Sequence, residues 1–540
     1  MKPMLINRGQ ALPLSDQAIH DLDILNILMK TEEQPDKAAC CARIKDFFSS
    51  DASELTERGA LLTDLAPVRA KDFEKALSYV RSVAEENEKY GRSLTRLDEV
   101  LYLTRRAESF ISAVDSFSDL LGVLTVTSSR LAALKAFFEA LRGSSEPVRH
   151  ALSEVRAMIR LPACLYLGIN VREDGTPQEY SFLGETFEHE PVNSLLSADH
   201  HDLPANSLSA EFVYNSRLYG FHLDEAINRT LEKRWKNALP KARKLLLAAP
   251  LPFMDELVGL TDELSWCLTG LRLSELYQDL GVSLCRPEPV ERAGVSFLIE
   301  ARDLHYPELC LSLPSAGGNA VSMAQNGIYI ITGANHSGTT SYLKIVGQSL
   351  ILAQLGFFVP AQSFRFVPVT GLHSLFSAGE DDSMDASRMG IEINKISDIA
   401  QHALPTDLVF FNEPLTSTNP LEAVSLCADL CRRFIAAGIP MLLVTHLYDV
   451  YFLLRAQLPE EQQSQLVSLI TESYYDEGQK SMVHAYRLRE ADPEGNSYAR
   501  ETAVSYGITV DQMLPASLQA AAQQYLDGAH SDSFYEGGKN

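Results

Sequence analysis

Long hydrophobic runs are missing from this sequence of 540 residues. A transmembrane helix needs about 18 or more consecutive apolar residues, and no such run occurs, so we expect no membrane span. The N-terminal stretch "MKPMLINRGQALPLSD" has no apolar segment long enough for an export signal. The eight cysteines are scattered and lack metal-ligand spacing beside histidines. These absences favour a cytoplasmic protein with reduced, mostly buried cysteines.

Positive charge is also scarce in this chain. It has 47 Lys and Arg residues against 71 Asp and Glu residues, which gives a formal net charge of −24. Because neutralisation of phosphates by Lys and Arg dominates affinity for nucleic acids, DNA is disfavoured as a partner. The segment "LEKRWKNALPKARK" (231–244) is the best candidate for a local basic patch, and a solvated helix face is its plainer explanation.

Residues 1–295 carry mostly helical periodicity. Phe73, Leu77 and Val80 recur at steps of three and four residues, which places them on one helical face. One interruption, "LYLGINVREDGTPQEYSFL" (165–183), alternates around Asp174-Gly175 and predicts a β-hairpin. This part of the sequence is therefore expected to be helical, with one small insertion.

The pattern changes at about residue 296, where short β-branched and aromatic runs alternate with helical stretches. Examples are "GIYIIT" (327–332), "TDLVFFNE" (406–413) and "IPMLLVTH" (439–446). Strands that are buried on both faces have this composition, so we predict a mostly parallel sheet covered by helices.

A glycine-rich loop, "GANHSGTTS" (333–341), follows the first of these strands and precedes a helix. Backbone N–H groups and the positive end of the helix dipole attract phosphate there without any charged side chain. Gly333 and Gly338 have the spacing of a phosphate-binding loop, in which a lysine follows the second glycine. Here that position is Thr339.

Six stretches in order resemble the MutS family of mismatch-repair ATPases. The longest, "GIYIITGANHSGTTSYLKIVGQSLILAQLGFFVPA" (327–361), is similar to the family's nucleotide-binding segment. The others are "ARDLHYPEL" (301–309), "DDSMDASRMGIEINKI" (381–396, with Ser387 and Glu392), "DLVFFNEPLTSTNPLEA" (407–423), "LLVTHLYDV" (442–450) and "EGNSYARETAVSYGI" (494–508).

The resemblance implies a role for each matching residue in binding ATP or ADP with Mg²⁺. Glu413 would be the general base for the attacking water, and His446 would sense the γ-phosphate. Ser387 would reach the nucleotide of a partner subunit in trans. Thr340 would bind Mg²⁺. The implied nucleotide-binding residues are Gly333, Asn335, His336, Ser337, Gly338, Thr339, Thr340, Ser341 and Asn412.

Two of these positions depart from the family pattern. Thr339 replaces the lysine, and Asn412 replaces the Walker B aspartate. Charge-assisted hydrogen bonds contribute about 1.5–3 kcal/mol each, so their loss lowers phosphate affinity roughly ten- to a hundred-fold. Because phosphoryl transfer depends on charge positioning, we expect weak or absent hydrolysis, as in a pseudo-ATPase.

The fold class implied is multidomain, with an all-α core and lever region followed by an α/β ABC-type P-loop ATPase domain. We expect a helical core at 1–160, in which "SELTERGALLTDL" (53–65) resembles the family's core helix, and a hairpin and loop insertion at 161–215. Lever helices would occupy 216–295, the ATPase domain 296–515, and a helix end and tail 516–540. The family's mismatch-reading domains have no counterpart here.

Alternatives remain at the level of both residues and function. Thr339 and Thr340 could be N-cap and first-turn residues, Asn412-Glu413 a strand end, His446 a core histidine, and Ser387 a helix cap. The favoured function is a dimer subunit, paired with itself or with an intact MutS-like paralogue. The alternatives are an active ATP-dependent DNA-binding MutS protein and a nucleotide-free scaffold.

Overall fold

The computed structural model describes residues 5–7, 14–32, 36–89, 96–159, 164–171, 173, 177–186, 232–313, 317–333, 337–376, 385–416, 418–476 and 481–493. The chain divides into two compact units. Unit 1 contains Met1–Leu5 and Pro67–Leu268, and unit 2 contains Ile6–Ala66 and Thr269–Asn540. The predicted domain boundaries stay predictions. Packing groups the N-terminal residues 6–66 with the C-terminal half of the chain.

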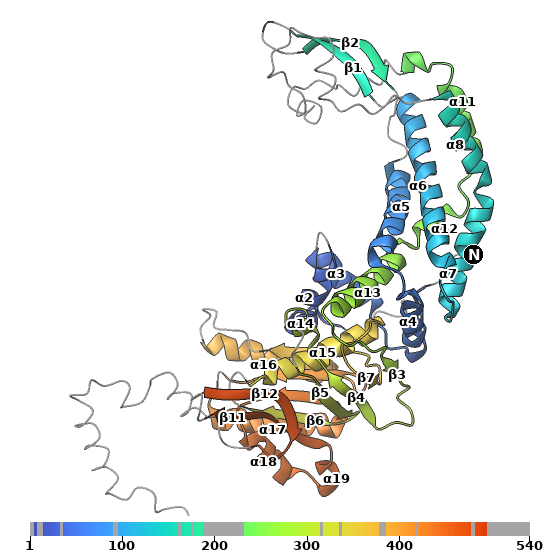
Figure 1. Cartoon of the computed structure of the whole chain (residues 1–540). Helices are drawn as coiled ribbons and strands as arrows, with labels where there is room; N and C mark the ends of the chain where they lie inside the picture. Colours follow the sequence, from blue (N-terminus) through green and yellow to red (C-terminus); the bar gives the residue numbers. More distant parts are fainter. Residues whose placement is uncertain are drawn as a thin grey trace, which may run out of the picture. The chain divides into compact units, whose positions relative to one another are not determined.

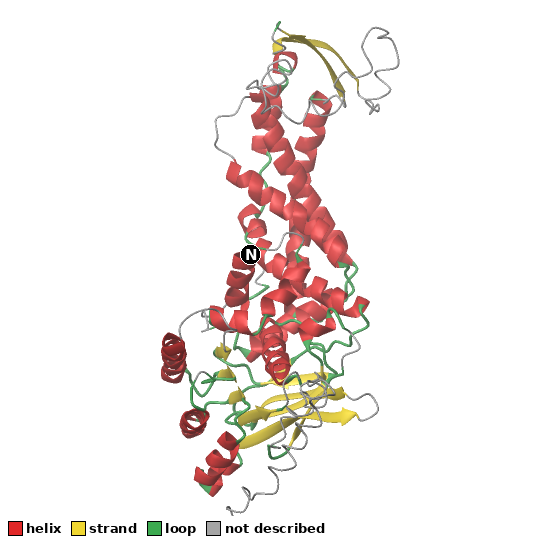
Figure 2. Ribbon diagram, turned by 90° about the vertical axis from the view of Figure 1, so that its left-hand side faces the viewer, coloured by secondary structure: helices red, strands yellow, loops and turns green. Residues whose placement is uncertain are grey.

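The described part of unit 1 is helical apart from one hairpin (Figure 2). Its described helices are α5 (Ala70–Lys89), α6 (Arg96–Gly122), α7 (Ser129–Ser144), α8 (Glu146–Met158), α11 (Leu239–Ala248), α12 (Met254–Val258) and the first part of α13 (Thr261–Asp279). The hairpin pairs β1 (Cys164–Val171) with β2 (Pro177–Thr186) in antiparallel register. The predicted hairpin is therefore confirmed, and Asp174-Gly175 lies outside the described residues.

Aromatic side chains fill the core of unit 1. Phe117 meets Phe73 edge-on at 5.4 Å and stacks on Phe138 at 4.7 Å, both measured between ring centroids. All three are buried, as are Leu77 and Val80, so the helical face predicted from their spacing is confirmed. Such offset and edge-to-face pairs add roughly 0.5–1.5 kcal/mol beyond the burial of their area.

A six-stranded sheet forms the centre of unit 2 (Figure 1). Its strand order is β12 (Ser481–Glu490), β11 (Leu466–Asp476), β6 (Ile328–Thr332), β10 (Met441–Val444), β9 (Leu408–Asn412) and β8 (Leu372–Phe376). All neighbours pair in parallel except β12 and β11. The predicted mostly parallel sheet is confirmed, and three of its central strands are the apolar runs read from the sequence.

Helices cover both faces of this sheet. Figure 1 shows α15 (Thr339–Leu355) on one face and α17 (Pro420–Ala437) with α18 (Asp449–Gln457) on the other. The second face buries a continuous cluster that includes Phe411 from β9 and Phe434 from α17, whose ring centroids lie 6.2 Å apart. Burial on both faces explains why these strands read as unbroken apolar runs.

A smaller sheet and further helices complete unit 2. The sheet has the order β3 (Glu288–Pro289), β7 (Ser363–Phe366), β4 (Phe297–Leu304) and β5 (Asn319–Ala324). Besides α15, α17, α18 and the last part of α13, the described helices outside the N-terminal segment are α14 (Pro307–Cys310), α16 (Asp385–His402) and α19 (Glu460–Gln463). Within the described ranges, no helix combines the length and the apolar composition that a membrane crossing requires.

The N-terminal segment packs within unit 2. It comprises α1 (Asp16–Asp21), α2 (Ile24–Leu28), η1 (Met29–Thr31), α3 (Lys37–Phe47) and α4 (Ala52–Leu65). Leu14 forms a parallel bridge to Leu372 on the outer edge of β8, and α1 packs beside that strand. An uncovered edge strand can pair with other chains, so this segment protects the sheet.

Candidate functional site

The glycine-rich loop connects β6 to α15 as predicted. Gly338 is the N-cap residue of α15 with φ 95°, a left-handed conformation that glycine adopts without a steric penalty. Thr339 is therefore the first helical residue and not the cap, which corrects that part of the structural alternative. Asn335 and His336 lie outside the described residues. The N-terminal end of a long helix thus faces the loop, as a phosphate site requires.

Close packing fixes the start of the loop. Ser337 is buried, and its hydroxyl accepts a hydrogen bond of 2.8 Å from the Thr471 hydroxyl on β11. A Cβ atom on Gly333 would lie 2.1 Å from Thr471 Oγ1 and 2.7 Å from Ser337 Oγ. Glycine is therefore required at 333 by contact with side chains. Thr471 was not predicted, because its partnership with the loop depends on the pairing of β11 with β6.

The first turn of α15 joins the end of β9. Thr340 Oγ1 donates a hydrogen bond of 3.0 Å to Oδ1 of Asn412, which is 9% exposed. Thr339 is buried on the same turn, and Ser341 is half-buried. The structure thus brings together Thr340 and Asn412, two positions that lie 72 residues apart in the sequence.

Glu413 and His446 form the second contact of the site. Glu413 Oε1 lies 3.2 Å from His446 Nε2, and the two side chains are 31% and 36% exposed. His446 is therefore not a core histidine, which corrects that alternative. Glu413 has φ 50°, and its backbone N–H donates to the carbonyl of Val444 on β10. An uncommon backbone conformation held by a neighbouring strand aims this carboxylate at His446.

Each partner shifts the pKa of the other. The hydrogen bond from His446 lowers the pKa of Glu413, while burial opposes that shift. The same hydrogen bond raises the pKa of His446, and a backbone hydrogen bond to Gly333 also raises it. His446 therefore links the carboxylate after β9 to the first glycine of the loop, and the pair favours a charged carboxylate beside a charged imidazole.

Helix α16 supports the loop that follows β9. Glu392 Oε1 accepts a hydrogen bond of 2.7 Å from the backbone N–H of Leu415, which is buried with φ 63°. This contact gives a structural reason for the glutamate in the stretch 381–396. Ser387 lies on the first turn of α16, and its side chain is outside the described part of the chain.

The residues available for Mg²⁺ are neutral. Thr340 and Asn412 offer a hydroxyl and an amide oxygen, whereas Mg²⁺ sites in proteins normally include one or two carboxylates. Among the described residues, no group of three or more His, Cys, Asp or Glu side chains is arranged to hold a metal ion. The site fits Mg²⁺ only where a bound phosphate supplies most of the negative charge.

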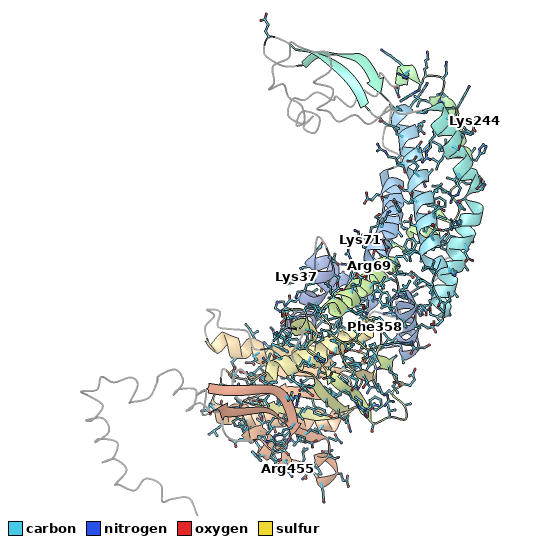
Figure 3. All side chains as sticks on the ribbon, viewed as in Figure 1. Lys37, Arg69, Lys71, Lys244, Phe358 and Arg455 are labelled. Atoms are coloured by element: carbon cyan, nitrogen blue, oxygen red, sulfur yellow. The ribbon has the colours of Figure 1, made fainter. Side chains whose placement is uncertain are left out.

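The basic segment singled out in the sequence is exposed in unit 1. Arg243 Nε lies 2.7 Å from Glu99 Oε2, so one positive charge of this segment is paired. Lys244 projects from α11 (Figure 3) and is exposed. Lys233, Lys236 and Lys241 are exposed as well. The described geometry is compatible with a solvated helix face and with a basic patch.

Comparisons with known proteins agree with the predicted resemblance. Residues 329–528 match the family model described as MutS domain V. A DNA mismatch repair protein MutS of Caldicellulosiruptor saccharolyticus is 31% identical over 130 residues, which cover 23% of this chain and 15% of that protein. A DNA mismatch repair protein HexA of Streptococcus pneumoniae is 26% identical over 212 residues, covering 38% of this chain and 23% of that protein.

The family model spans the loop and both contact pairs of the candidate site, because Gly333, Thr340, Asn412, Glu413 and His446 all lie within it. The alignments span less than a quarter of the length of those two relatives. The matched region ends at 528, beyond the last described residue. Residues 329–528 of this chain therefore carry a domain V of the MutS type.

Proposed function

We propose that this chain is a MutS-type subunit with an ABC-type ATPase fold that binds ATP or ADP and hydrolyses it weakly or not at all. The supporting observation is the meeting of two contacts beside one loop: Thr340 with Asn412, and Glu413 with His446. The first contact would hold phosphate and Mg²⁺, and the second would orient water. Thr339 and Asn412 leave the first without charge.

The contrast between these contacts explains the expected weakness. The carboxylate of Glu413 keeps the charge that a general base needs, and its lowered pKa keeps it ionised at neutral pH. Within the loop and the Thr340–Asn412 pair, however, phosphate would meet only backbone N–H groups and neutral side chains. Since phosphoryl transfer relies on electrostatic positioning, a base without a cationic clamp gives little turnover.

Binding of nucleotide is the first property to test. Titration of the full chain with ATP and Mg²⁺ in a calorimeter should show weak binding. The Gly333→Ala variant should abolish it, because its Cβ would collide with the side chains of Ser337 and Thr471. The matched control is Gly390→Ala on α16, where a Cβ meets nothing within 4 Å. Equal affinity in both variants would show that the loop does not bind nucleotide.

We further propose that the subunit acts as a dimer, with itself or with an intact MutS-like paralogue. Helix α16, which carries Ser387 near its start, presents Ile391 with 54% exposure and Ile393 with 42% exposure. These two residues do not share one helical face, so Ile391, the more exposed of the two, is the side chain that we assign to the dimer contact. In such a dimer the Ser387 hydroxyl would donate to a γ-phosphate across the interface, a role that needs no lysine in this chain.

Mass measurement in solution tests the dimer. Sedimentation should give a dimer for the chain alone or with the paralogue, and Ile391→Glu should shift it to monomer. Val123→Glu in unit 1 is a control, because Val123 is 85% exposed and distant in sequence from α16. In the dimer, Ser387→Ala should lower the partner's ATPase rate more than that of this chain. A strict monomer under all conditions would remove the dimer proposal.

A second candidate is an ATP-dependent DNA-binding protein in a mismatch-repair-like process, as the names of the relatives suggest. The exposed lysines of the 231–244 segment are the observation that favours it. DNA binding would then weaken with salt, and Lys241→Glu with Lys244→Glu would reduce that salt dependence. No binding to either matched or mismatched duplexes at low salt would leave the weak ATPase subunit or a nucleotide-free scaffold.

A further inference from the structure

A lysine on the helix after the loop is already paired with a carboxylate. Lys344 Nζ on α15 contacts Asp23 Oδ2 in the N-terminal segment. The two side chains are 21% and 31% exposed, so the pair lies at the border of solvent. Asp23 precedes α2 and has φ 53°, in the left-handed region. Its carboxylate thus comes from a turn 321 residues distant in the chain.

The geometry of α15 directs this lysine toward the candidate phosphate site. Lys344 follows Thr340 by four residues, which places both on the same helical face. Helical side chains lean toward the N-terminus, and one turn spans about 5.4 Å, which is within the reach of a lysine side chain. The ammonium group can therefore approach the level of Thr340, whose hydroxyl contacts Asn412.

The turn that holds Asp23 is anchored beside the same strand ends. Asp21 Oδ2 accepts hydrogen bonds from Ser374 Oγ at 2.7 Å and from the backbone N–H of Phe376 at 3.3 Å. Phe376 is the register neighbour of Asn412 across β8 and β9. Contacts thus run from Asp21 through these strand ends to Thr340, while Lys344, one turn further along α15, contacts Asp23.

Tight packing between these anchors restricts movement of the helix itself. The Gln348 side chain is buried and donates to the carbonyl of Leu22 at 2.8 Å. A Cβ on Gly347 would lie 2.5 Å from a Leu22 methyl group. The helix and the turn are therefore fixed together, whereas the ends of the lysine and aspartate side chains are partly exposed and can exchange partners.

We infer that Lys344 supplies the phosphate-binding cation of the site, and that Asp23 is the counter-ion which a nucleotide phosphate displaces. This inference rests on the proposed function, because it assigns a residue to the same nucleotide site. A partly exposed ion pair is weak, and a phosphate group with several charged oxygens competes well for an ammonium group. Lys344, which lies outside the loop, then supplies the positive charge that Thr339 lacks.

Two substitutions separate this role from a structural one. Asp23→Asn removes the competing charge, and asparagine tolerates the left-handed backbone of that turn. In calorimetry of the full chain with ATP and Mg²⁺, we expect Asp23→Asn to lower Kd about three- to ten-fold. Lys344→Met should raise Kd about ten-fold or more, and the double variant should match Lys344→Met, since Asp23 acts only through the lysine.

The control breaks a similar pair in the same segment. Lys45 Nζ lies 2.6 Å from Asp16 Oδ1, and Asp16→Asn should leave Kd unchanged. If Lys344→Met does not fold, Lys344→Arg replaces it in the test, because arginine keeps the cation. The Kd of Lys344→Arg for ATP should lie within about three-fold of that of the unmodified chain, and adding Asp23→Asn should again lower it.

The outcomes distinguish this inference from the proposed function. ATP binding that neither Asp23→Asn nor Lys344→Met alters would overturn the inference and leave the nucleotide site standing. If no variant binds ATP, including a Thr339→Lys chain with Asn412→Asp that restores both charges, the proposed function itself is wrong. Weaker binding in Asp23→Asn would show that the aspartate supports the site structurally and would also overturn the inference.

Discussion

The two contact pairs of the candidate site differ in charge, although both include a residue at the carboxyl end of β9. Thr340 and Asn412 share a neutral hydrogen bond, whereas Glu413 and His446 form a contact in which both pKa shifts favour charge. Both pairs use the carboxyl end of β9, because Asn412 is its last residue and Glu413 follows it. Within the proposed nucleotide site, one pair therefore carries charge and the other does not.

Restoring charge to the neutral pair should have the largest effect. In the double variant Thr339→Lys with Asn412→Asp, a lysine would meet phosphate oxygens and a carboxylate would support Mg²⁺ at Thr340. Each charge-assisted bond contributes about 1.5–3 kcal/mol, so we expect roughly a hundred-fold tighter binding of Mg²⁺ with ATP in calorimetry. Omission of Mg²⁺ should remove most of the gain. Unchanged affinity would mean that the loop does not hold the phosphates.

Crowding the loop should have the next largest effect, now on stability. Gly333→Ala places a methyl group against Thr471 and Ser337, and overpacking of this kind costs about 1–3 kcal/mol of unfolding free energy. Denaturant unfolding should detect the loss. Adding Thr471→Ala to the Gly333→Ala chain removes Oγ1, the atom nearest to the new methyl group, and should recover part of the lost unfolding free energy. A Gly333→Ala chain as stable as the Gly390→Ala control would contradict the packing described here.

Removing charge from the ionic pair should have a smaller effect that depends on pH. The raised pKa of His446 stabilises the fold below its unfolded pKa of about 6.5, and the contribution disappears as pH rises through the higher folded pKa. The lowered pKa of Glu413 stabilises the fold at pH values above its unfolded pKa of about 4.3. That contribution disappears as pH falls through the lower folded pKa.

Both groups are charged between these limits, so the pair is strongest from about pH 4.3 to about pH 6.5. Glu413→Gln should therefore lower the thermal midpoint most in that window and least at pH 9. Because the pair is about one-third exposed, the loss should stay within about 1 kcal/mol. An NMR titration should show a lower His446 pKa in Glu413→Gln. An unchanged value would show that the pair does not form in solution.

Much of this site was predictable because its residues lie at the ends of strongly patterned strands. The runs before Gly333, Asn412 and His446 are almost wholly apolar, so their burial, their shared sheet and the loops after them follow from composition. The positions of Thr340 and Asn412 followed from the resemblance, and their contact became visible only with the strand register.

Other contacts left no signal in the sequence. The Asp23 turn lies between two helices of six and five residues, which are too short to show a period. Lys344, the partner of Asp23, and Phe376, the partner of the adjacent Asp21, are more than 300 residues away. The bridge from Leu14 to β8 depends on a single pair. The grouping of residues 6–66 with the C-terminal half likewise depends on tertiary packing, which local patterns do not encode.

The rate of ATP hydrolysis by the purified chain tests the central claim most directly. The claim is that Glu413 and His446 remain in place while the phosphate-holding pair lacks charge. Turnover of the unmodified chain should therefore be near background and equal to that of Glu413→Gln, whereas Thr339→Lys with Asn412→Asp should raise it in a manner that Glu413→Gln abolishes. Hydrolysis by the unmodified chain alone, at a rate that Glu413→Gln removes, would contradict this account.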